Sequence, residues 1–295
     1  MESCAPRLPK VSVIVPVYNA ESTLADCINS LLELDYPKEN RELIFVDNAS
    51  TDKSADLLRQ FGGEGKILFE RKKGSAAARN RGVSTARGDV VAFTDSDCVV
   101  DKDWLRKIVV PLEDDGVGIV GGRILAKRPC NEIEESGEAI HDHGKAINEY
   151  KPPYVITMNW ASRLSVLNEV GLFDERFMRG QDVDLSWRIF RNGYRLVYEP
   201  QAIVHHENEQ TRAGLFREGY VHGFASVRAL KKHKDLVKQF GHRRFSVSGY
   251  RALARSFIDV VRRSNPRDSN SYLAFNLGKK IGKVLGSIRF LYIDL

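Results

Sequence analysis

The sequence predicts an α/β fold in which helices cover both faces of a doubly wound sheet. Two observations predict it. Four short apolar runs alternate with helical patterns in residues 10–95, the order expected when strands and helices alternate in space. Polar residues follow three of these runs, in the segments VYN, VDN and TDSD. In such sheets ligands bind beyond the carboxyl ends of the strands, so these segments predict a binding site.

The strands are predicted by runs that are apolar without interruption. KVSVIVPVY (10–18) has the composition of a parallel strand that is buried on both faces. ELIFVDN, ILFE and DVVAFTD are shorter runs of the same kind. Between the first two, residues 24–32 carry apolar side chains on one helical face. Further helices are expected from about Asp52 and over the Ala-rich stretch that ends at Gly88.

The pattern is less regular from Val117 onward. GIVGGRIL predicts another strand, and VITMNWASRL predicts a strand that runs into a turn. The polar stretch between them, CNEIEESGEAIHDHGKAINEY, is expected to be helical or partly mobile. DVDLSWRIFRNGY predicts a helix that ends at Gly193, and RLVYEPQAIVHHE predicts two short strands on either side of Pro200.

The net charge of +6 is distributed unevenly along the chain. Residues 207–295 contain 18 Lys and Arg against 7 Asp and Glu, a net charge of +11, whereas residues 1–206 contain 27 against 32, a net charge of −5. We therefore expect residues 1–210 to form the α/β domain and residues 211–295 to form a basic helical region. Such a region suits an anionic partner, with a solvated helical surface as the alternative. No nucleic-acid motif or interleaved stacking aromatic residues accompany the basic charge, so no nucleic-acid partner is expected.

The last segment predicts an amphipathic helix with basic residues beside its apolar stripe. This pattern suits a contact with an anionic membrane surface, and a homodimer contact through the same stripe is the alternative. No run of about 18 apolar residues predicts a membrane-spanning helix, and the N-terminus lacks the apolar core of a secretory signal. We therefore expect a cytoplasmic protein, with peripheral attachment at the inner face of the cell membrane as a further expectation. The stripe consists of Leu273, Leu277, Ile281, Val284, Leu285, Ile288 and Tyr292, and Lys279, Lys280 and Lys283 flank it.

Asp95 and Asp97 form the most informative pair of carboxylates. They follow the fourth apolar run, and residues two apart in an extended strand end point to the same side. Hard oxygen ligands of this kind suit Mg²⁺ or Mn²⁺. The alternative is a polar turn that caps the next helix, with Asp101 or Asp103 as the capping residue.

Two other segments suggest contacts with a nucleotide. Asp47 ends the second run and could accept hydrogen bonds from a base or a ribose, or form a local turn with Asn48. Gly74 and Ser75 open a helix behind basic residues, and the N-terminus of a helix attracts phosphate. Arg79, about one turn further, could bind a pyrophosphate oxygen, or it could simply face solvent.

Acid–base and metal chemistry have candidates later in the chain. Asp182 and Asp184 start a helix after a glycine-containing loop, where a carboxylate can serve as a catalytic base or merely as a helix cap. His205 and His206 point to opposite faces if they lie in a strand. One imidazole beside two aspartates would favour Mn²⁺ over Ca²⁺, and the alternative is a pair of partly buried polar residues.

Taken together and in order, the segments VSVIVPVYNAESTLADCINSLL, LIFVDNASTDKSADLL, GSAAARNRGVSTARGDVVAFTDSD and VGLFDERFMRGQDVDLSWRIFRNGYRLVYEPQAIVHH resemble the inverting glycosyltransferases of family 2. The resemblance spans residues 10–207. It implies the GT-A fold, a Rossmann-like, doubly wound mixed sheet flanked by helices, here followed by a C-terminal helical extension.

The resemblance also implies a role for each candidate residue. Asp182 would be the general base, as the second residue of the family's Glu-Asp pair; this chain departs from the pattern at the first position, where Gln181 would contact the acceptor. The family's late histidine falls on His206 by its spacing from Pro200, with His205 as the alternative. Trp160 would stack on an acceptor sugar, or it packs in the core. The implied donor-binding residues are Pro16, Tyr18, Asp47, Arg79, Asp95 and Ser96, and the implied metal ligands are Asp95, Asp97 and His206.

The implied function is a metal-dependent transfer of a sugar, with Mn²⁺ or Mg²⁺ as cofactor. The donor would be a UDP-, GDP- or dTDP-sugar, and the acceptor a hydroxyl group of a glycan or lipid-linked glycan in polysaccharide or cell-envelope biosynthesis. Inverting transfer is one displacement and needs a single base without an enzyme nucleophile. The alternative is a catalytically silent sugar-nucleotide-binding or scaffolding protein, although such a protein would be expected to lose one of Asp95, Asp97 and Asp182.

Overall fold

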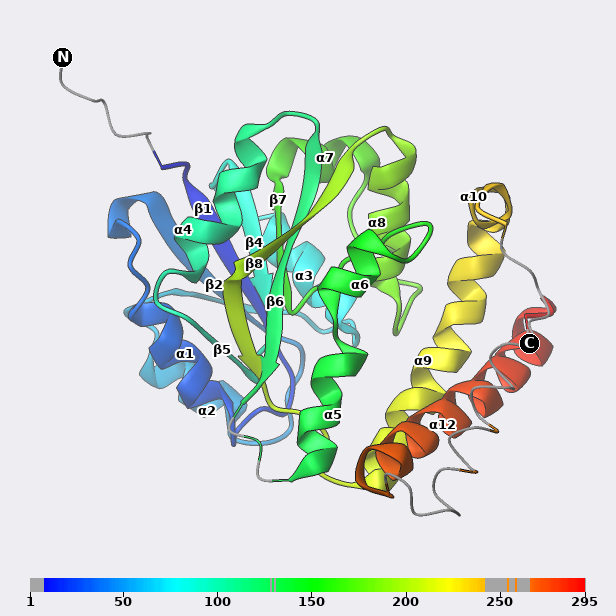
Figure 1. Cartoon of the computed structure of the whole chain (residues 1–295). Helices are drawn as coiled ribbons and strands as arrows, with labels where there is room; N and C mark the ends of the chain where they lie inside the picture. Colours follow the sequence, from blue (N-terminus) through cyan, green and yellow to red (C-terminus); the bar gives the residue numbers. More distant parts are fainter. Residues whose placement is uncertain are drawn as a thin grey trace.

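The computed structural model describes residues 8–127, 129, 131–241, 254, 258 and 266–294. Across these residues the strands are β1 (Val11–Val17), β2 (Arg41–Asp47), β3 (Lys66–Phe69), β4 (Val90–Thr94), β5 (Cys98–Val100), β6 (Val117–Ala126), β7 (Asn159–Arg163) and β8 (Arg195–His206). They form one mixed sheet in the order β3-β2-β1-β4-β7-β6-β8-β5 (Figure 1). The pairs among β1 to β4 are parallel, β7 runs antiparallel to β4 and β6, and β8 is parallel to β6 and antiparallel to β5.

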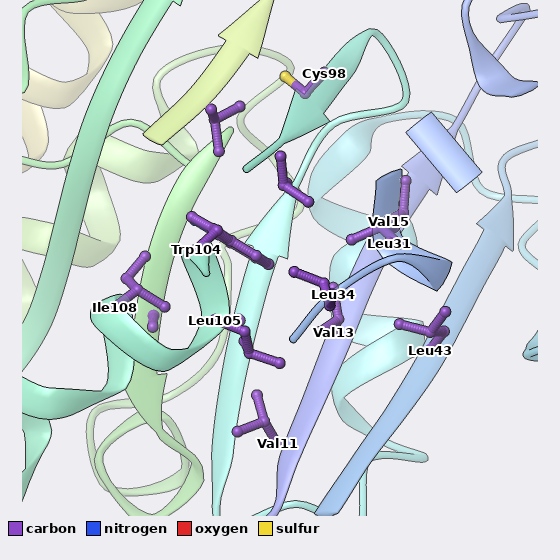
Figure 2. Close-up of a cluster of buried hydrophobic side chains, with 14 of the residues drawn as sticks. Val11, Val13, Val15, Leu31, Leu34, Leu43, Cys98, Trp104, Leu105 and Ile108 are labelled. Carbon is purple, nitrogen blue, oxygen red and sulfur yellow. The ribbon is translucent and has the colours of Figure 1, made fainter. Parts of the chain in front are cut away.

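Helices cover both faces of this sheet, as the sequence predicts for the doubly wound class. They are α1 (Leu24–Leu32), α2 (Ser54–Gln60), α3 (Ser75–Val83), α4 (Trp104–Val109), α5 (Glu132–Ile140), α6 (His143–Asn148), α7 (Leu164–Val170), α8 (Gln181–Arg191), α9 (Arg212–Lys232), α10 (Lys234–Gln239) and α12 (Pro266–Phe290), with short 3-10 helices at Lys38–Asn40 and Val110–Glu113. Figure 2 shows Val13 and Val15 of β1 beside Leu31 of α1 and Trp104 of α4 on one face. Ile14 belongs to the core of the opposite face, with residues of α3, α7 and α8. A strand buried on both faces is apolar at successive positions, which explains the uninterrupted run.

Two elements differ from the sequence expectations. RLVYEPQAIVHHE forms one strand, β8, instead of two, and Pro200 lies where the register between β6 and β8 shifts. Proline cannot donate a ladder hydrogen bond, so it is tolerated at such an irregularity. Strand β5, which follows Asp97 directly and pairs with β8, was not predicted. Three residues are too few to produce a recognisable pattern of strand burial.

The C-terminal helices pack through glycines and not through the predicted apolar stripe. α9 and α12 lie side by side next to the sheet domain (Figure 1). A Cβ atom added at Gly223 would lie 2.0 Å from the carbonyl oxygen of Lys279, and one added at Gly282 would lie 2.1 Å from that of Tyr220. The two backbones therefore approach so closely that only glycine fits at these positions.

The apolar stripe of α12 consequently remains at the surface. Ile288 is 66% exposed, and Leu277, Ile281, Val284 and Leu285 are exposed as well. None of the helices in the described part of the chain has the length and apolar content that a membrane span requires. The boundary at residue 210 stays a prediction.

Candidate active site

The carboxyl ends of β1 and β2 bring the predicted nucleoside-binding residues to one edge of the sheet. In their parallel pairing, Pro16 lies opposite Val46 and Val17 lies opposite Asp47. Pro16 and Asp47 are buried, and Tyr18, one residue beyond the end of β1, is 51% exposed. The edge therefore combines a buried carboxylate with an accessible aromatic ring.

Asn48, which the sequence suggested only as a turn residue, connects this edge to α3. Its Nδ2 donates to the carbonyl oxygens of Glu70 (3.0 Å) and Lys72 (2.7 Å), and its Oδ1 accepts from the backbone N–H of Gly74 (2.8 Å). These partners lie 22 to 26 residues further along the chain. Asn48 thus fixes the loop that leads into α3, the helix that carries Arg79.

Arg79 is buried at the centre of the site, with a relative exposure of 2%. Its Nη2 donates to Oδ1 of Asp95 at 2.6 Å. Its Nε and Nη1 are also buried, and they have no hydrogen-bond partner among the described residues. Buried N–H groups are almost always paired in proteins. The guanidinium therefore retains donors for an anion supplied by a ligand.

The pairing of β5 with β8 brings His206 to the predicted metal-binding carboxylates. Cys98 lies opposite His206 in this pairing, and Nε2 of His206 is 3.6 Å from Oδ2 of Asp97. Burial opposes the charged imidazole, but the carboxylate of Asp97 outweighs it and raises the pKa of His206 to about 9. Burial raises the pKa of Asp97, and His206 outweighs that effect and holds this pKa below its usual range.

The structure places His206 and not His205 beside these carboxylates. Neighbouring residues of a strand point to opposite faces, and Nε2 of His205 lies 3.0 Å from Oδ1 of Asp101 instead. Asp101 therefore belongs to a separate pair. It does not face the candidate metal site.

Asn208 orients the ring of His206, and sequence reasoning missed it although it lies in the HHENE segment. Its Oδ1 is 2.7 Å from Nδ1 of His206, and its Nδ2 donates to the carbonyl oxygen of Glu134 at 2.7 Å. Because an amide oxygen can only accept, Nδ1 of His206 carries a proton and donates it to Asn208. Nε2 is then directed at Asp97, the arrangement by which proteins commonly hold a metal-binding histidine.

Two carboxylates and one imidazole fit a divalent ion such as Mn²⁺ or Mg²⁺ by their chemistry. Within the described residues, no three His, Cys, Asp or Glu side chains are grouped closely enough to hold a metal ion. Asp95 is hydrogen-bonded to Arg79, and Asp97 faces His206. Arg79 contacts Oδ1 of Asp95, so the second carboxylate oxygen of Asp95 is not used in that hydrogen bond.

Asp182 is the second residue of α8, and Gly180 precedes this helix with a φ of 76°, in the left-handed region that favours glycine. Its Oδ1 accepts from the backbone N–H of Val183 at 2.9 Å. Burial raises the pKa of Asp182; the charge of Arg79 opposes this effect and the charge of Asp95 adds to it. Asp182 is thus near both residues. A carboxylate whose pKa is raised is suited to accept a proton.

Gln181 and Ser96 are the remaining predicted polar residues of the site. Nε2 of Gln181 donates to Oγ of Ser75 at 2.9 Å, which joins the first turns of α8 and α3. Oε1 of Gln181 is buried and has no partner within the described residues. Ser96 is buried in the turn between the carboxylates Asp95 and Asp97. Ser75 was noted in the sequence as a helix start, but its contact with Gln181 was not foreseen.

The ring of Trp160 packs inside the protein. Trp160 is fully buried, and its ring centroid lies 5.6 Å from that of Phe93 and 5.4 Å from that of Phe173. A ring without an exposed face cannot stack on an acceptor sugar, so the structure favours the core-packing alternative.

Comparisons with known proteins agree with this architecture. The model of the family "Glycosyl transferase family 2" matches residues 12–171. Glycosyltransferase AglE of Haloferax volcanii is 33% identical over 209 residues, which cover 68% of this chain and 67% of that protein. The pre-mycofactocin glycosyltransferase of Mycobacterium tuberculosis is 33% identical over 235 residues, 76% of this chain, and the match spans 48% of that protein, about half its length.

A solved structure provides an independent comparison of the fold. The mannosyltransferase PcManGT from Pyrobaculum calidifontis, in complex with GDP-Man and Mn²⁺, superposes with a TM-score of 0.71 at 19% identity, over 95% of this chain and 88% of that chain. This likeness confirms the GT-A fold. The family model covers more than half of the chain and includes Asp47, Arg79, Asp95 and Asp97. The chain therefore belongs to glycosyltransferase family 2 and is a transferase enzyme.

Proposed function

We propose that this enzyme transfers a sugar with inversion from a nucleotide-sugar donor to a hydroxyl group, with Asp182 as the general base. The observation that carries the proposal is the hydrogen bond between Gln181 and Ser75, which holds the start of α8, with Asp182, against the start of α3, which carries Arg79. There, a carboxylate with a raised pKa is influenced by a buried guanidinium whose Nε and Nη1 have no hydrogen-bond partner among the described residues. The first group suits proton removal, and the second suits a diphosphate.

The donor would lie along the edge formed by β1, β2 and β4. Asp47 would accept hydrogen bonds from the base or ribose, and Pro16 and Tyr18 would border the nucleoside. Arg79 would bind the diphosphate oxygens, together with the turn that contains Ser96. The base is open among UDP-, GDP- and dTDP-sugars; the structural neighbour PcManGT was solved with GDP-Man.

We assign Asp97, His206 and Asp95 as the groups that would hold Mn²⁺ or Mg²⁺. When bound, such an ion neutralises the negative charge that develops on the departing diphosphate. The ion would replace the proton on Nε2 of His206, because metal-binding imidazoles are neutral. PcManGT was solved with Mn²⁺, which supports a divalent ion in this fold.

The transfer reaction needs a single base. Asp182 accepts the proton of the acceptor hydroxyl as the oxygen of that group forms a bond to the anomeric carbon. The bond from that carbon to the diphosphate oxygen breaks at the same time, and its electron pair leaves with the nucleoside diphosphate. Because the new bond forms opposite the old one, the anomeric configuration inverts. Arg79 stabilises the charge of the leaving group, and the half-buried position of Asp182 limits how far water solvates the base.

The metal assignment can be tested by thermal unfolding. We expect UDP, GDP or dTDP to raise the melting temperature further when Mn²⁺ is present, since binding at about one hundred times Kd stabilises the folded state by about 2.7 kcal/mol. Asp97→Asn should remove the Mn²⁺-dependent part of the shift. Asp101→Asn is the matched control, because Asp101 pairs with His205 outside the site. An equal Mn²⁺-dependent shift in Asp97→Asn would show that Asp97 does not bind the ion.

The acceptor is proposed to be a glycan or lipid-linked glycan of the cell envelope, presented at an anionic membrane surface. The support is α12, which exposes Leu285 and Ile288 and carries the basic residue Lys280 at the edge of this stripe. Apolar side chains flanked by lysine suit the interface of an anionic bilayer, where each basic residue contributes about 1 kcal/mol. The alternative is that the same stripe contacts a second copy of the chain in a homodimer.

Vesicle sedimentation distinguishes membrane binding from dimer formation. The full chain should sediment with phosphatidylglycerol-containing vesicles and less with pure phosphatidylcholine vesicles, and Leu285→Glu together with Ile288→Glu should release it. Val110→Glu is the control, because Val110 is an exposed apolar residue outside α12. Unchanged sedimentation of the α12 double variant would refute membrane contact by this stripe. A wild-type dimer that the double variant converts to monomer, without vesicle binding, would identify the stripe as a dimer interface.

A further inference from the structure

The end of α9 contacts the chain segment that carries Asp182. Arg228 and Lys232 lie four positions apart and so share one side of α9, and His233 directly follows the helix. All three contact residues 174–184, which we name the base segment. The end of α9 is therefore joined directly to the segment that carries the candidate base.

The central contact joins His233 to Asp184. Nε2 of His233 is 2.8 Å from Oδ1 of Asp184, and the exposed fractions of these residues are 2% and 0%. The ring of His233 packs edge-on against Trp187, with centroids 5.4 Å apart. Nδ1 of His233 is buried without a partner within the described residues. Asp184 is therefore the hydrogen-bond partner of this buried imidazole.

Lys232 and Arg228 add contacts on either side. Nζ of Lys232 lies 2.6 Å from Oδ1 of Asp184 and 2.9 Å from Oδ2 of Asp174, so one ammonium group links both ends of the base segment. The guanidinium of Arg228 donates to the carbonyl oxygen of Arg176. Burial raises the pKa of Asp184, but the donors from His233 and Lys232 outweigh it and hold this pKa below its usual range. Asp184 therefore stays ionised and anchored.

The geometry of α8 links the position of Asp184 to the orientation of Asp182. Residues of an α-helix follow one another at about 100°, so Asp182 and Asp184 are about 200° apart around α8. The charges of Arg79 and Asp95 act on Asp182, whereas Asp184 faces the end of α9. Holding Asp184 on one side of α8 thus determines how the helix is rotated, and with it the direction of Asp182 on the other side.

We propose that Arg228, Lys232 and His233 form a clamp that positions the general base of the transfer reaction. The inference rests on the proposed role of Asp182. The clamp residues are positioning residues, because they contact the base segment and not the reacting atoms. The C-terminal helices are thereby part of the catalytic unit in addition to any role in membrane contact.

The clamp predicts a loss of turnover without a loss of donor binding. In the full-length protein, turnover is measured as nucleoside diphosphate release from a panel of UDP-, GDP- and dTDP-sugars with Mn²⁺ and water as acceptor. His233→Ala should lower kcat by about 10²-fold, the cost of a base displaced by about 1 Å. KM for the donor, and Kd of the nucleoside diphosphate by calorimetry, should stay at wild-type values. His233→Gln, whose amide can still donate to Asp184, should recover most of kcat.

The controls separate positioning from folding. Lys234→Ala, next to the clamp on the exposed side of α10, should behave as wild type. Should His233→Ala fail to fold, Lys232→Met removes a clamp contact from a partly exposed position and should show the same split between kcat and KM. Wild-type kcat in His233→Ala, equal losses of kcat and donor affinity, or no recovery in His233→Gln would each overturn the clamp. Wild-type turnover in Asp182→Asn would instead overturn the proposed base and the clamp with it.

Discussion

Replacement of Asp182 by asparagine is expected to lower turnover by about 10²- to 10⁴-fold, the usual contribution of a positioned general base. Asparagine has nearly the same shape and can still accept the hydrogen bond from the N–H of Val183, but it cannot take a proton. Donor affinity should therefore change little. Turnover is measured by nucleoside diphosphate release, and binding is measured by calorimetry with the nucleoside diphosphate and Mn²⁺.

The pH dependence supplies a second signature of the same residue. Asp182 works as a base only when ionised, so kcat should fall as pH decreases through its pKa. Because burial raises this pKa, the fall should be centred above about 3.9, the ordinary value for aspartate. Asp182→Asn should lack this acidic limb, and Asp182→Glu should keep it at lower kcat. An unchanged acidic limb in Asp182→Asn would assign the titration to another group.

The strands of this fold were predictable because a strand that is buried on both faces is a continuous apolar run in the sequence. β1 is apolar at nearly every position since both of its faces are covered, and this run is visible without knowledge of its neighbours. The packing of α12 left no such pattern. The apolar stripe suggested a membrane or dimer contact and gave no sign of how α12 packs within the chain, where it meets α9 through glycines such as Gly282. Glycine has no side chain, so a contact between two helix backbones produces no apolar pattern in the sequence.

The residues of the candidate site also divide into those that lie in a local sequence motif and those that do not. Asp47, Arg79 and Asp95 each lie in a short motif at a strand end or helix start, so the motif order was enough to propose them together. Asn48 binds a loop 22 to 26 residues away, and His233 binds Asp184 across 49 residues. Hydrogen bonds between such distant positions have no periodic signal, which is why these supporting residues emerged only from the structure.

Trp160 shows a different limit of sequence reasoning. A tryptophan at a strand end has the same local pattern whether its ring meets a sugar or the core. Only the positions of Phe93 and Phe173, which enclose its ring, distinguish the two cases.

Replacement of Arg79 by lysine is expected to weaken the binding of nucleoside diphosphates by about 10- to 100-fold, although the charge is conserved. A lysine ammonium can keep the contact with Asp95, but it lacks the planar fork whose Nε and Nη1 have no partner in the described part of the chain. Each hydrogen bond between charged groups contributes about 1.5–3 kcal/mol, and about 1.4 kcal/mol corresponds to a tenfold change in affinity.

Calorimetric titration with UDP, GDP and dTDP in the presence of Mn²⁺ measures this loss directly. Arg81→Lys is the matched control, because Arg81 lies two residues further along α3 and is exposed. Its affinity should equal that of the wild type. The unfolding temperature of Arg79→Lys without nucleotide should stay close to wild type, since the ion pair with Asp95 is retained. If Arg79→Lys binds the diphosphates as tightly as Arg81→Lys, then the free donors of the buried guanidinium do not serve the donor, and the phosphate contacts must come from the backbone N–H groups at the start of α3.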